Sequence, residues 1–435
     1  MKSLALVFVL FVVIVMGLIS CQKTEKMIEA DIELISPSEN SIIYLPDTLQ
    51  IKLRIEAAGD IESVKISIVN SNYISLFGTN TINSPTAGKE IETTMLLRIL
   101  QDYNDSPYKI RVKVKYPDNE QNTYFNIQLT NKPLAYKGFF LFSRPGIQLT
   151  NIVFYDQNLN DTSFAVSSGE YLDSDISSFY EKLFLLTDTP AKLKTFSIVD
   201  QLTEWEAEPV FPNPEFTDIQ INEDRIYAGM ESGQVVGYST LNGQQKLITE
   251  MLSDSFPEKV FILEEFIIGD FLSRMNGNRT LVTFYKETGA KKHRQPISFP
   301  VVSFANTVYP DKVLVIGNEN QKGKISLYNV LNNYFENTHQ IDTGEIIAVC
   351  EINEETILFS IGRSVYLYHY KQSYSNWLAT FDDTPANIYF EHISQQLIVQ
   401  FEKRLSILKF PGMDEVTRLN FEKTLKGVQL YYQYD

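Results

Sequence analysis

The sequence of 435 residues has few of the side chains that bind metal ions or form disulfides, with only two cysteines and four histidines. The cysteines are Cys21 and Cys350, and if Cys21 carries a lipid then Cys350 has no partner for a disulfide within the chain. The histidines, at positions 293, 339, 369 and 392, form no pair at metal-ligand spacing. A Gly-x-Ser-x-Gly nucleophile elbow is absent as well. We therefore expect no metal site and no cofactor.

Positive charge is also scarce. Lys and Arg number 38 against 54 Asp and Glu, which gives a net charge of −16. A surface this acidic repels nucleic-acid phosphates and anionic lipid headgroups. We expect no nucleic-acid partner, and any attachment to a membrane must come from something other than surface charge.

Long apolar runs are absent except near the N-terminus, where Leu4–Met16 follows Lys2 and leads into Leu18-Ile19-Ser20-Cys21. This arrangement resembles a bacterial lipoprotein signal peptide, which implies removal of residues 1–20 and a lipid on Cys21. An uncleaved anchor is the alternative, because the run is almost long enough to span a bilayer. The small residue directly before the cysteine favours lipidation, and the lipid would hold the protein on a membrane.

Residues 21–27 form a short polar tether. Gln22-Lys23 followed by Glu25 is similar to part of the export signal of surface lipoproteins of the Bacteroidota, although Thr24 stands where the first acidic residue would be. The resemblance implies a lipid-anchored outer-membrane protein at the cell surface. An orientation toward the periplasm is the alternative.

Helix-forming stretches rich in Ala or Leu are scarce, whereas aromatic residues make up 12% of the chain. Val, Ile and Tyr are frequent, and this composition predicts an all-β fold. Turns with Gly, Asn and Asp separate the expected strands and leave no room for crossover helices.

Seven short apolar runs recur after residue 138, each followed by a turn and a second strand. The runs are Phe139–Phe142, Leu183–Leu186, Ile226–Gly229, Phe266–Gly269, Val313–Ile316, Ile357–Ser360 and Leu397–Gln400. The second strands align at Tyr155, Phe196, Tyr238, Tyr285, Tyr328, Tyr368 and Leu408, with spacings of 41, 42, 47, 43, 40 and 40 residues. This period is typical of four-stranded propeller blades and predicts a seven-bladed β-propeller over residues 133–435.

The two ends of the repeat region predict how the propeller closes. The first unit lacks an innermost strand, while the chain finishes with an extra one, Gly427–Tyr432. We expect this last strand to join the hairpin Gly138–Ser167 as its inner strand, which removes both open sheet edges. Six or eight blades fit this pattern less well.

Residues 28–132 do not share the repeat and predict six strands: Ile32–Ile35, Leu49–Ile55, Ser63–Ile68, Thr94–Ile99, Lys109–Tyr116 and Thr123–Leu129. The size and strand number resemble the immunoglobulin-like β-sandwiches at the base of many bacterial surface lipoproteins, without the cysteines and tryptophan of antibody domains. The resemblance implies a spacer.

The repeat region resembles divergent WD-like or quinoprotein-like propellers, although the Gly-His and Trp-Asp landmarks are missing and Asp follows the aligned aromatic only at Asp156.

Propellers bind ligands through loops at the ends of their channel. Two such loops in neighbouring blades contain guanidinium and amide groups, and we predict a binding patch there. Its residues are Arg274, Asn276, Arg279, Asn318 and Asn320. Solvated turn-forming residues are the alternative interpretation.

Trp205 and Trp377 occupy a recurring large apolar position, which predicts packing. Cys350 lies in an apolar run typical of a buried, inert thiol.

The sequence therefore predicts a non-catalytic envelope lipoprotein whose propeller binds a protein or glycan partner. An enzyme acting on polysaccharide in the channel is one alternative, with Asp188, Asp382 and Asp383 as candidate carboxylates. A structural subunit of an envelope assembly is the other.

Overall fold

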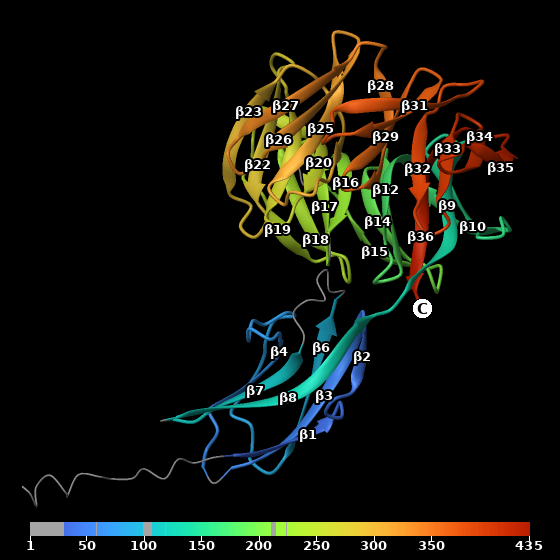
Figure 1. Ribbon diagram of the computed structural model, residues 1–435. Coiled ribbons are helices and arrows are strands. Elements are labelled where there is room, and N and C mark those ends of the chain that lie inside the picture. Colours follow the sequence, from blue (N-terminus) through green and yellow to red (C-terminus); the bar gives the residue numbers. More distant parts are fainter. Residues whose placement is uncertain (1–29, 58, 99–106, 118, 210–214, 223) are drawn as a thin grey trace, which may run out of the picture. The chain divides into compact units, whose positions relative to one another are not determined.

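The computed structural model describes residues 30–57, 59–98, 107–117, 119–209, 215–222 and 224–435 (Figure 1). Every regular element in these ranges is a strand, so the all-β class predicted from the sequence is confirmed. Within the same ranges, no helix has the length and apolar character of a membrane span. The expected signal peptide (1–20), Cys21 and the tether (21–27) lie outside the described residues.

The chain divides into two compact units, residues 1–133 and 134–435. The first unit contains two sheets that share one hydrophobic core. One sheet has the order β1-β3-β6, and the other has the order β2-β8-β7-β4-β5. Their strands are β1 (Asp31–Ser36), β2 (Ile42–Leu45), β3 (Asp47–Glu56), β4 (Ser63–Val69), β5 (Asn80–Asn83), β6 (Glu90–Leu97), β7 (Tyr108–Lys115) and β8 (Glu120–Asn131).

Alternation of side chains along the strands builds this core. On β7, Tyr108, Ile110, Val112 and Val114 are buried, while the residues between them are cationic and point away from the core. Six of the eight strands were expected from the sequence. The other two, β2 and β5, have only four residues each and give no clear periodicity.

The second unit consists of seven four-stranded antiparallel sheets (Figure 1). The first sheet contains β9 (Leu134–Gly146), β10 (Leu149–Asp156), β11 (Asp161–Ser168) and the C-terminal strand β36 (Leu425–Tyr434). The next three sheets are β12 (Glu170–Ser177), β13 (Lys182–Asp188), β14 (Lys192–Ser197) and β15 (Thr203–Ala207); β16 (Phe216–Asn222), β17 (Arg225–Met230), β18 (Gln234–Ser239) and β19 (Gln245–Ile248); and β20 (Ser255–Ile262), β21 (Phe266–Ser273), β22 (Arg279–Tyr285) and β23 (Lys291–Ile297).

The remaining three sheets follow the same order along the chain. They are β24 (Val301–Ala305), β25 (Lys312–Glu319), β26 (Lys322–Asn329) and β27 (Tyr334–Ile341); β28 (Ile346–Asn353), β29 (Thr356–Ile361), β30 (Ser364–His369) and β31 (Tyr374–Thr380); and β32 (Asn387–Glu391), β33 (Gln396–Gln400), β34 (Arg404–Lys409) and β35 (Asp414–Asn420). The seven apolar runs lie in the second strand of each sheet, where both faces are buried against neighbouring sheets.

We call β36, β12, β16, β20, β24, β28 and β32 the inner strands. Each contacts the inner strands of the two neighbouring sheets, and β36 contacts both β12 and β32. The contacts between sheets therefore return to the sheet in which they began. β36 pairs antiparallel with β9, with Val428 opposite Leu141 and Leu430 opposite Phe139.

We predict that deleting Gly427–Asp435 will lower the melting temperature of the second unit by at least about 5 °C, equivalent to ~3 kcal/mol for a unit of this size. The deletion removes the buried side chains of Val428 and Tyr431 and leaves one edge of β9 unpaired. Differential scanning calorimetry measures the change. Asp435→Asn is the control, because it removes only the exposed ion pair with Lys137, and we expect less than about 0.5 kcal/mol from it. An unchanged melting temperature in the deletion variant would contradict a stabilising role for β36.

Candidate functional site

A polar cavity of about 340 Å³ lies between the inner strands of four successive sheets, β16, β20, β24 and β28. Side chains of Asp218, Lys259, Ser303 and Glu351 contribute to its wall. The other lining residues are Ile219, Gln220, Val260, Phe261, Val302, Phe304 and Asn306. The cavity therefore combines carboxylate, amide, hydroxyl and ammonium groups, while the rings of Phe261 and Phe304 beside it are buried in a hydrophobic cluster.

The acidic side chains on the inner strands bind the backbone of the next sheet. Asp175 on β12 accepts a hydrogen bond from the backbone N–H of Ile221 on β16 at 2.7 Å, and Asp173 accepts a longer one from Ile219 at 3.5 Å. The N–H groups on that edge of an inner strand have no partner within their own sheet. A buried N–H without a partner costs about 1–3 kcal/mol, so these carboxylates stabilise the junction between sheets.

The next junction repeats the arrangement. Asp218 Oδ2 accepts a hydrogen bond from Val260 N–H at 2.8 Å, and Gln220 Oε1 accepts one from Ile262 N–H at 2.9 Å. The other oxygen of Asp218 accepts a bond from Lys259 Nζ at 2.7 Å. Asp218 is almost fully buried, and its carboxylate raises the pKa of Lys259.

Other side chains perform the same task at three further junctions, β20 with β24, β24 with β28, and β32 with β36. Asp270 accepts from Val301 N–H at 3.0 Å, Tyr389 Oη accepts from Val428 N–H at 3.1 Å, and Glu351 accepts from Asn306 N–H at 2.9 Å. Where β36 meets β12, the Gln429 amide donates to the carbonyl of Ser174.

Burial of these carboxylates disfavours their charged form. It raises the pKa of Asp175 to about 6 and raises the pKa of Glu351. Burial, with the nearby Asp218 carboxylate, also raises the pKa of Asp173. Stability from these three groups therefore falls as pH rises from the ordinary carboxyl pKa toward the raised values.

Sequence analysis missed this set of acceptors. A signal existed, because Asp173 and Asp218 occupy matching positions of successive repeats, as do Asp175 and Gln220. Acidic residues are abundant along the whole chain, which hid the periodicity.

The predicted patch does not form a single group of solvated donors. Arg279 is only 16% exposed, and its guanidinium lies 2.5 Å from both Asp270 Oδ2 and Glu258 Oε2. Asn318 bridges to the next sheet, since its amide accepts from Ile346 N–H at 2.7 Å and donates to Ile346 O at 2.8 Å. Both residues hold neighbouring strands together.

The other three patch residues are exposed. The Arg274 guanidinium lies 4.9 Å from the ring centre of Phe256, and Asn276 accepts a hydrogen bond from Asn278 N–H within its turn. Asn320 and Gln321 have φ values of 52° and 64° and form the tight turn between β25 and β26. These contacts are those of hairpin-turn residues.

The candidate carboxylates of an enzyme make local contacts. Asp383 lies 3.3 Å from Arg404, and Asp188 accepts a hydrogen bond from Thr189 N–H in its own turn. Cys350 is half-buried and not fully buried as predicted, and burial raises the pKa of its thiol to about 12, which disfavours the thiolate. No group of His, Cys, Asp and Glu that could hold a metal ion occurs in the described part of the chain.

The two tryptophans differ. Trp205 packs against Phe184 and Tyr238, with ring centres 5.9 and 6.5 Å apart, as a packing position requires. Trp377 is 61% exposed on the outermost strand β31, so the packing prediction is wrong for this residue. An outermost strand has one face open to solvent, and the sequence repeat does not distinguish that face from the packed one.

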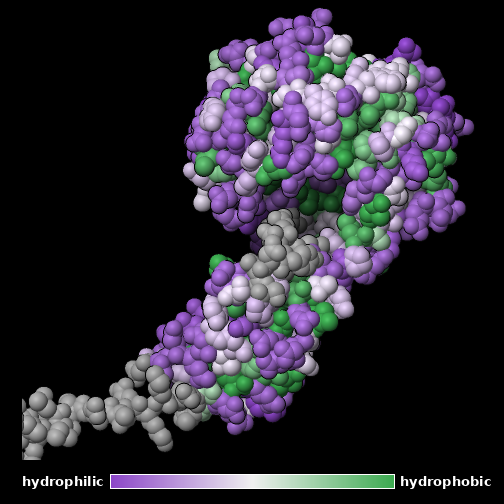
Figure 2. All heavy atoms as spheres, in the orientation of Figure 1, coloured by the Kyte–Doolittle hydropathy of each residue, from purple (hydrophilic) through white to green (hydrophobic). Residues whose placement is uncertain are grey.

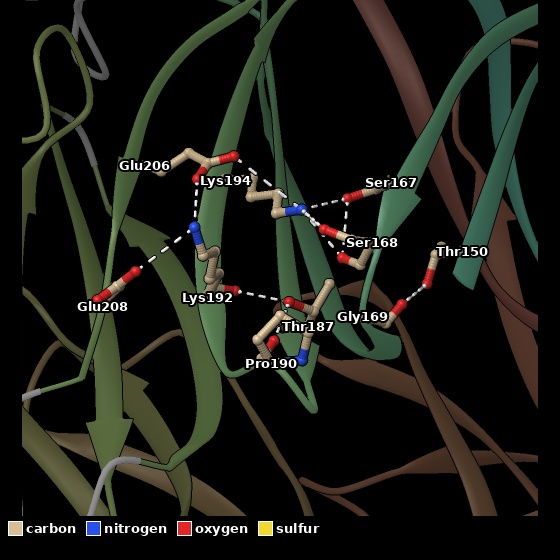
Figure 3. Close-up of polar contacts among 10 residues, drawn as sticks. All are labelled: Thr150, Ser167, Ser168, Gly169, Thr187, Pro190, Lys192, Lys194, Glu206 and Glu208. Carbon is tan, nitrogen blue, oxygen red and sulfur yellow. Dashed lines mark hydrogen bonds and ion pairs between the residues drawn. The ribbon is translucent and has the colours of Figure 1, made fainter. Parts of the chain in front are cut away.

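A second polar cluster joins the first and second sheets (Figure 3). Lys194 is buried, and its ammonium donates to Ser167 Oγ at 2.8 Å and to Ser168 O and Oγ at 2.9 Å. A catalytic Ser-Lys pair needs a neutral amine with its lone pair directed at the serine hydroxyl. Burial lowers the pKa of Lys194. Its three donated hydrogen bonds are nevertheless those of a charged ammonium group that holds two sheets together.

Comparison with known proteins identifies no family. No protein-family model matches the sequence, and no curated protein matches it. Among solved structures, the chain is similar to the crystal structure of the computationally designed Ika8 protein. The sequence identity is 9%, the alignment covers 67% of this chain and 89% of that chain, and the TM-score is 0.49. A likeness of this extent carries no information about function.

We predict that Arg279→Ala will lower the free energy of unfolding by about 2–4 kcal/mol, because it leaves the buried Asp270 carboxylate without its cation. Arg274→Ala, a matched change in the same hairpin, should cost about 0.5 kcal/mol or less because the side chain is exposed. Urea unfolding of both variants measures the difference. Equal, small effects would mean that Arg279 has no structural role.

Proposed function

We propose that this protein is a non-catalytic cell-envelope lipoprotein, anchored in the outer membrane through a lipid on Cys21, whose second unit binds a protein or glycan partner. The second unit is a seven-bladed β-propeller and the first is an immunoglobulin-like sandwich that acts as a spacer. Seven four-stranded sheets in chain order, inner-strand contacts that return to β36, and two sheets around one core support these assignments.

The chemistry of the cavity is the observation that carries the binding function. Catalysis by a carboxylate pair requires two carboxyl groups that are directed at the substrate and at a water or a leaving group. In this cavity Asp218 is bonded to Val260 N–H and Lys259, and Glu351 is bonded to Asn306. Both acids are used in hydrogen bonds that hold neighbouring sheets together. The polar groups of the wall taken together are suited to binding a polar group of a ligand.

The dimensions of the cavity define what enters it. A volume of about 340 Å³ lies at the lower end of the range for small-ligand sites. One sugar residue of a glycan or one long side chain of a protein partner is an occupant of that size. The Lys259 ammonium keeps donors beyond the one that it gives to Asp218, whereas the Ser303 hydroxyl donates to Phe304 O and offers such an occupant an acceptor.

The lipid anchor has a direct test. We predict that cells grown with an alkyne fatty acid will label the full-length protein and that Cys21→Ser will abolish the label, because Cys21 stands at the predicted acylation position. Ser20→Ala is the control, since it keeps a small residue before the cysteine. Label that persists in Cys21→Ser would exclude lipidation at this position.

We predict that Ser303→Tyr will reduce recovery of the partner at least tenfold, because the larger side chain fills the cavity. The tagged full-length protein is recovered from its own envelope, and bound protein and carbohydrate are quantified by mass spectrometry. Ser375→Tyr, the same change at an exposed position of the outermost strand β31, is the control and should leave recovery unchanged. If folded Ser303→Tyr, verified by circular dichroism, recovers the same amount of partner, the cavity is not the binding site.

A further inference from the structure

The outer face of the five-stranded sheet in the first unit carries a row of cations on its central strand, β7. Lys109, Arg111, Lys113 and Lys115 alternate with the buried core residues of that strand and point away from the core. On the neighbouring strand β4, Lys65 stands directly opposite Lys113. Like charges in such a cross-strand position destabilise a sheet. These cations make no contribution to the hydrophobic core, so packing does not explain why they are grouped on this face.

The second sheet of the same unit shows what a neutralised outer face looks like. On β3, Lys52 lies 2.6 Å from Glu90 and 3.0 Å from Glu92. Arg54 lies 3.2 Å from Glu33 and 3.0 Å from Glu90. Each cation of that sheet therefore contacts two carboxylates on adjacent strands.

The five-stranded sheet is different. Lys113 and Lys115 each contact one carboxylate, at 2.6 Å, whereas Lys65, Lys109 and Arg111 have no ion pair within the described ranges. Within the described ranges, the Arg111 guanidinium donates one hydrogen bond, from Nε to Ser67 Oγ at 3.2 Å. The face therefore keeps an excess of positive charge in a chain whose net charge is −16.

Aromatic and amide groups lie on the same face. Lys109 Nζ lies 5.5 Å from the ring centre of Tyr73 and 5.9 Å from that of Tyr124, and both rings are partly exposed. On β8, Asn122 and Gln128 are exposed on the same side as Tyr124. Amides donate to and accept from hydroxyl groups, and tyrosine rings pack against the apolar faces of sugar rings.

From this combination we propose that the outer face of the five-stranded sheet binds an anionic polysaccharide, a chain whose sugars bear carboxylate or sulfate groups. Arg111 and Lys65 pair with the anionic groups, the β8 amides bind hydroxyls, and Tyr73 and Tyr124 support a sugar ring. The eight-residue central strand β7 offers roughly 27 Å of contact length, which suits an extended polymer. The inference adds a ligand to the unit that the proposed function treats as a spacer.

Charge complementarity also restricts where such a polymer binds. Residues 134–435 contain 25 Lys and Arg against 39 Asp and Glu, so the second unit repels a polyanion. The cationic face of the first unit is the place where attraction exceeds repulsion.

The test measures binding of the chain from Gln22 to Asp435 to polygalacturonate by biolayer interferometry. Fully methyl-esterified polygalacturonate is the matched neutral probe. We expect binding to the anionic probe only, with at least a tenfold loss of affinity between 50 and 500 mM salt, because the Debye length shortens from about 14 to about 4 Å. Equal binding of the two probes, or no binding of polygalacturonate and of chondroitin sulfate, would overturn the proposal.

Two variants of equal charge change locate the site. Lys65→Gln/Arg111→Gln removes one lysine and one arginine from the five-stranded sheet and should weaken binding at least tenfold. Lys52→Gln/Arg54→Gln removes the same pair of residue types from the other sheet and should change affinity less than twofold. Circular dichroism verifies that both variants fold. Equal weakening in the two variants would overturn the assignment to this face, and equally strong binding to phosphatidylglycerol vesicles or single-stranded DNA would overturn the polysaccharide assignment.

Discussion

In the second unit, backbone N–H groups on the inner strands find their hydrogen-bond acceptors in side chains of a neighbouring sheet. Asp175, Asp218 and Asp270 supply carboxylate oxygens, while Gln220 and Asn318 supply amide oxygens. A sheet edge that is enclosed by protein must satisfy its donors, or each one costs free energy. The hydrophobic clusters hold the sheets together, and the polar wall of the cavity and the raised pKa values of Asp175 and Asp270 follow from the requirement to satisfy these donors.

The same requirement separates structural acids from acids that are available for chemistry. A carboxylate that accepts a backbone hydrogen bond has fewer acceptor sites left for a substrate. The strand that it binds also fixes the position of the carboxylate. In the first unit the outer faces of the two sheets differ in charge: each cation on one sheet contacts two carboxylates, whereas only two of the five cations on β4 and β7 of the other sheet contact one. Figure 2 shows that hydrophilic residues prevail on the visible surface of both units. The pairing of charged side chains, and not the number of hydrophilic residues, therefore distinguishes an ordinary solvated face from a binding site.

The sequence predicted the repeat well because its signal is local. Runs such as Leu183–Leu186 are buried on both faces, so they read as uninterrupted apolar segments, and the turns between strands are marked by Gly, Asn and Asp. The pairing of the C-terminal strand with β9 followed from counting strands at the two ends. The candidate site could not be predicted in this way. Whether Arg279 faces solvent or Asp270 depends on how two strands of a hairpin twist, and whether Asp218 meets Val260 depends on the distance between sheets. Neither quantity is encoded in spacing along the chain.

The first sheet of the second unit joins residues 134–168 to residues 425–434. During synthesis, the strand β9 emerges almost 300 residues before its partner β36. Contacts of such long sequence separation form slowly, because the intervening chain must first be confined. For most of translation, one edge of β9 is therefore open to pairing with other chains. The first sheet can be completed only after Leu425–Tyr434 have been synthesised, so the chain cannot close this sheet before translation is almost finished.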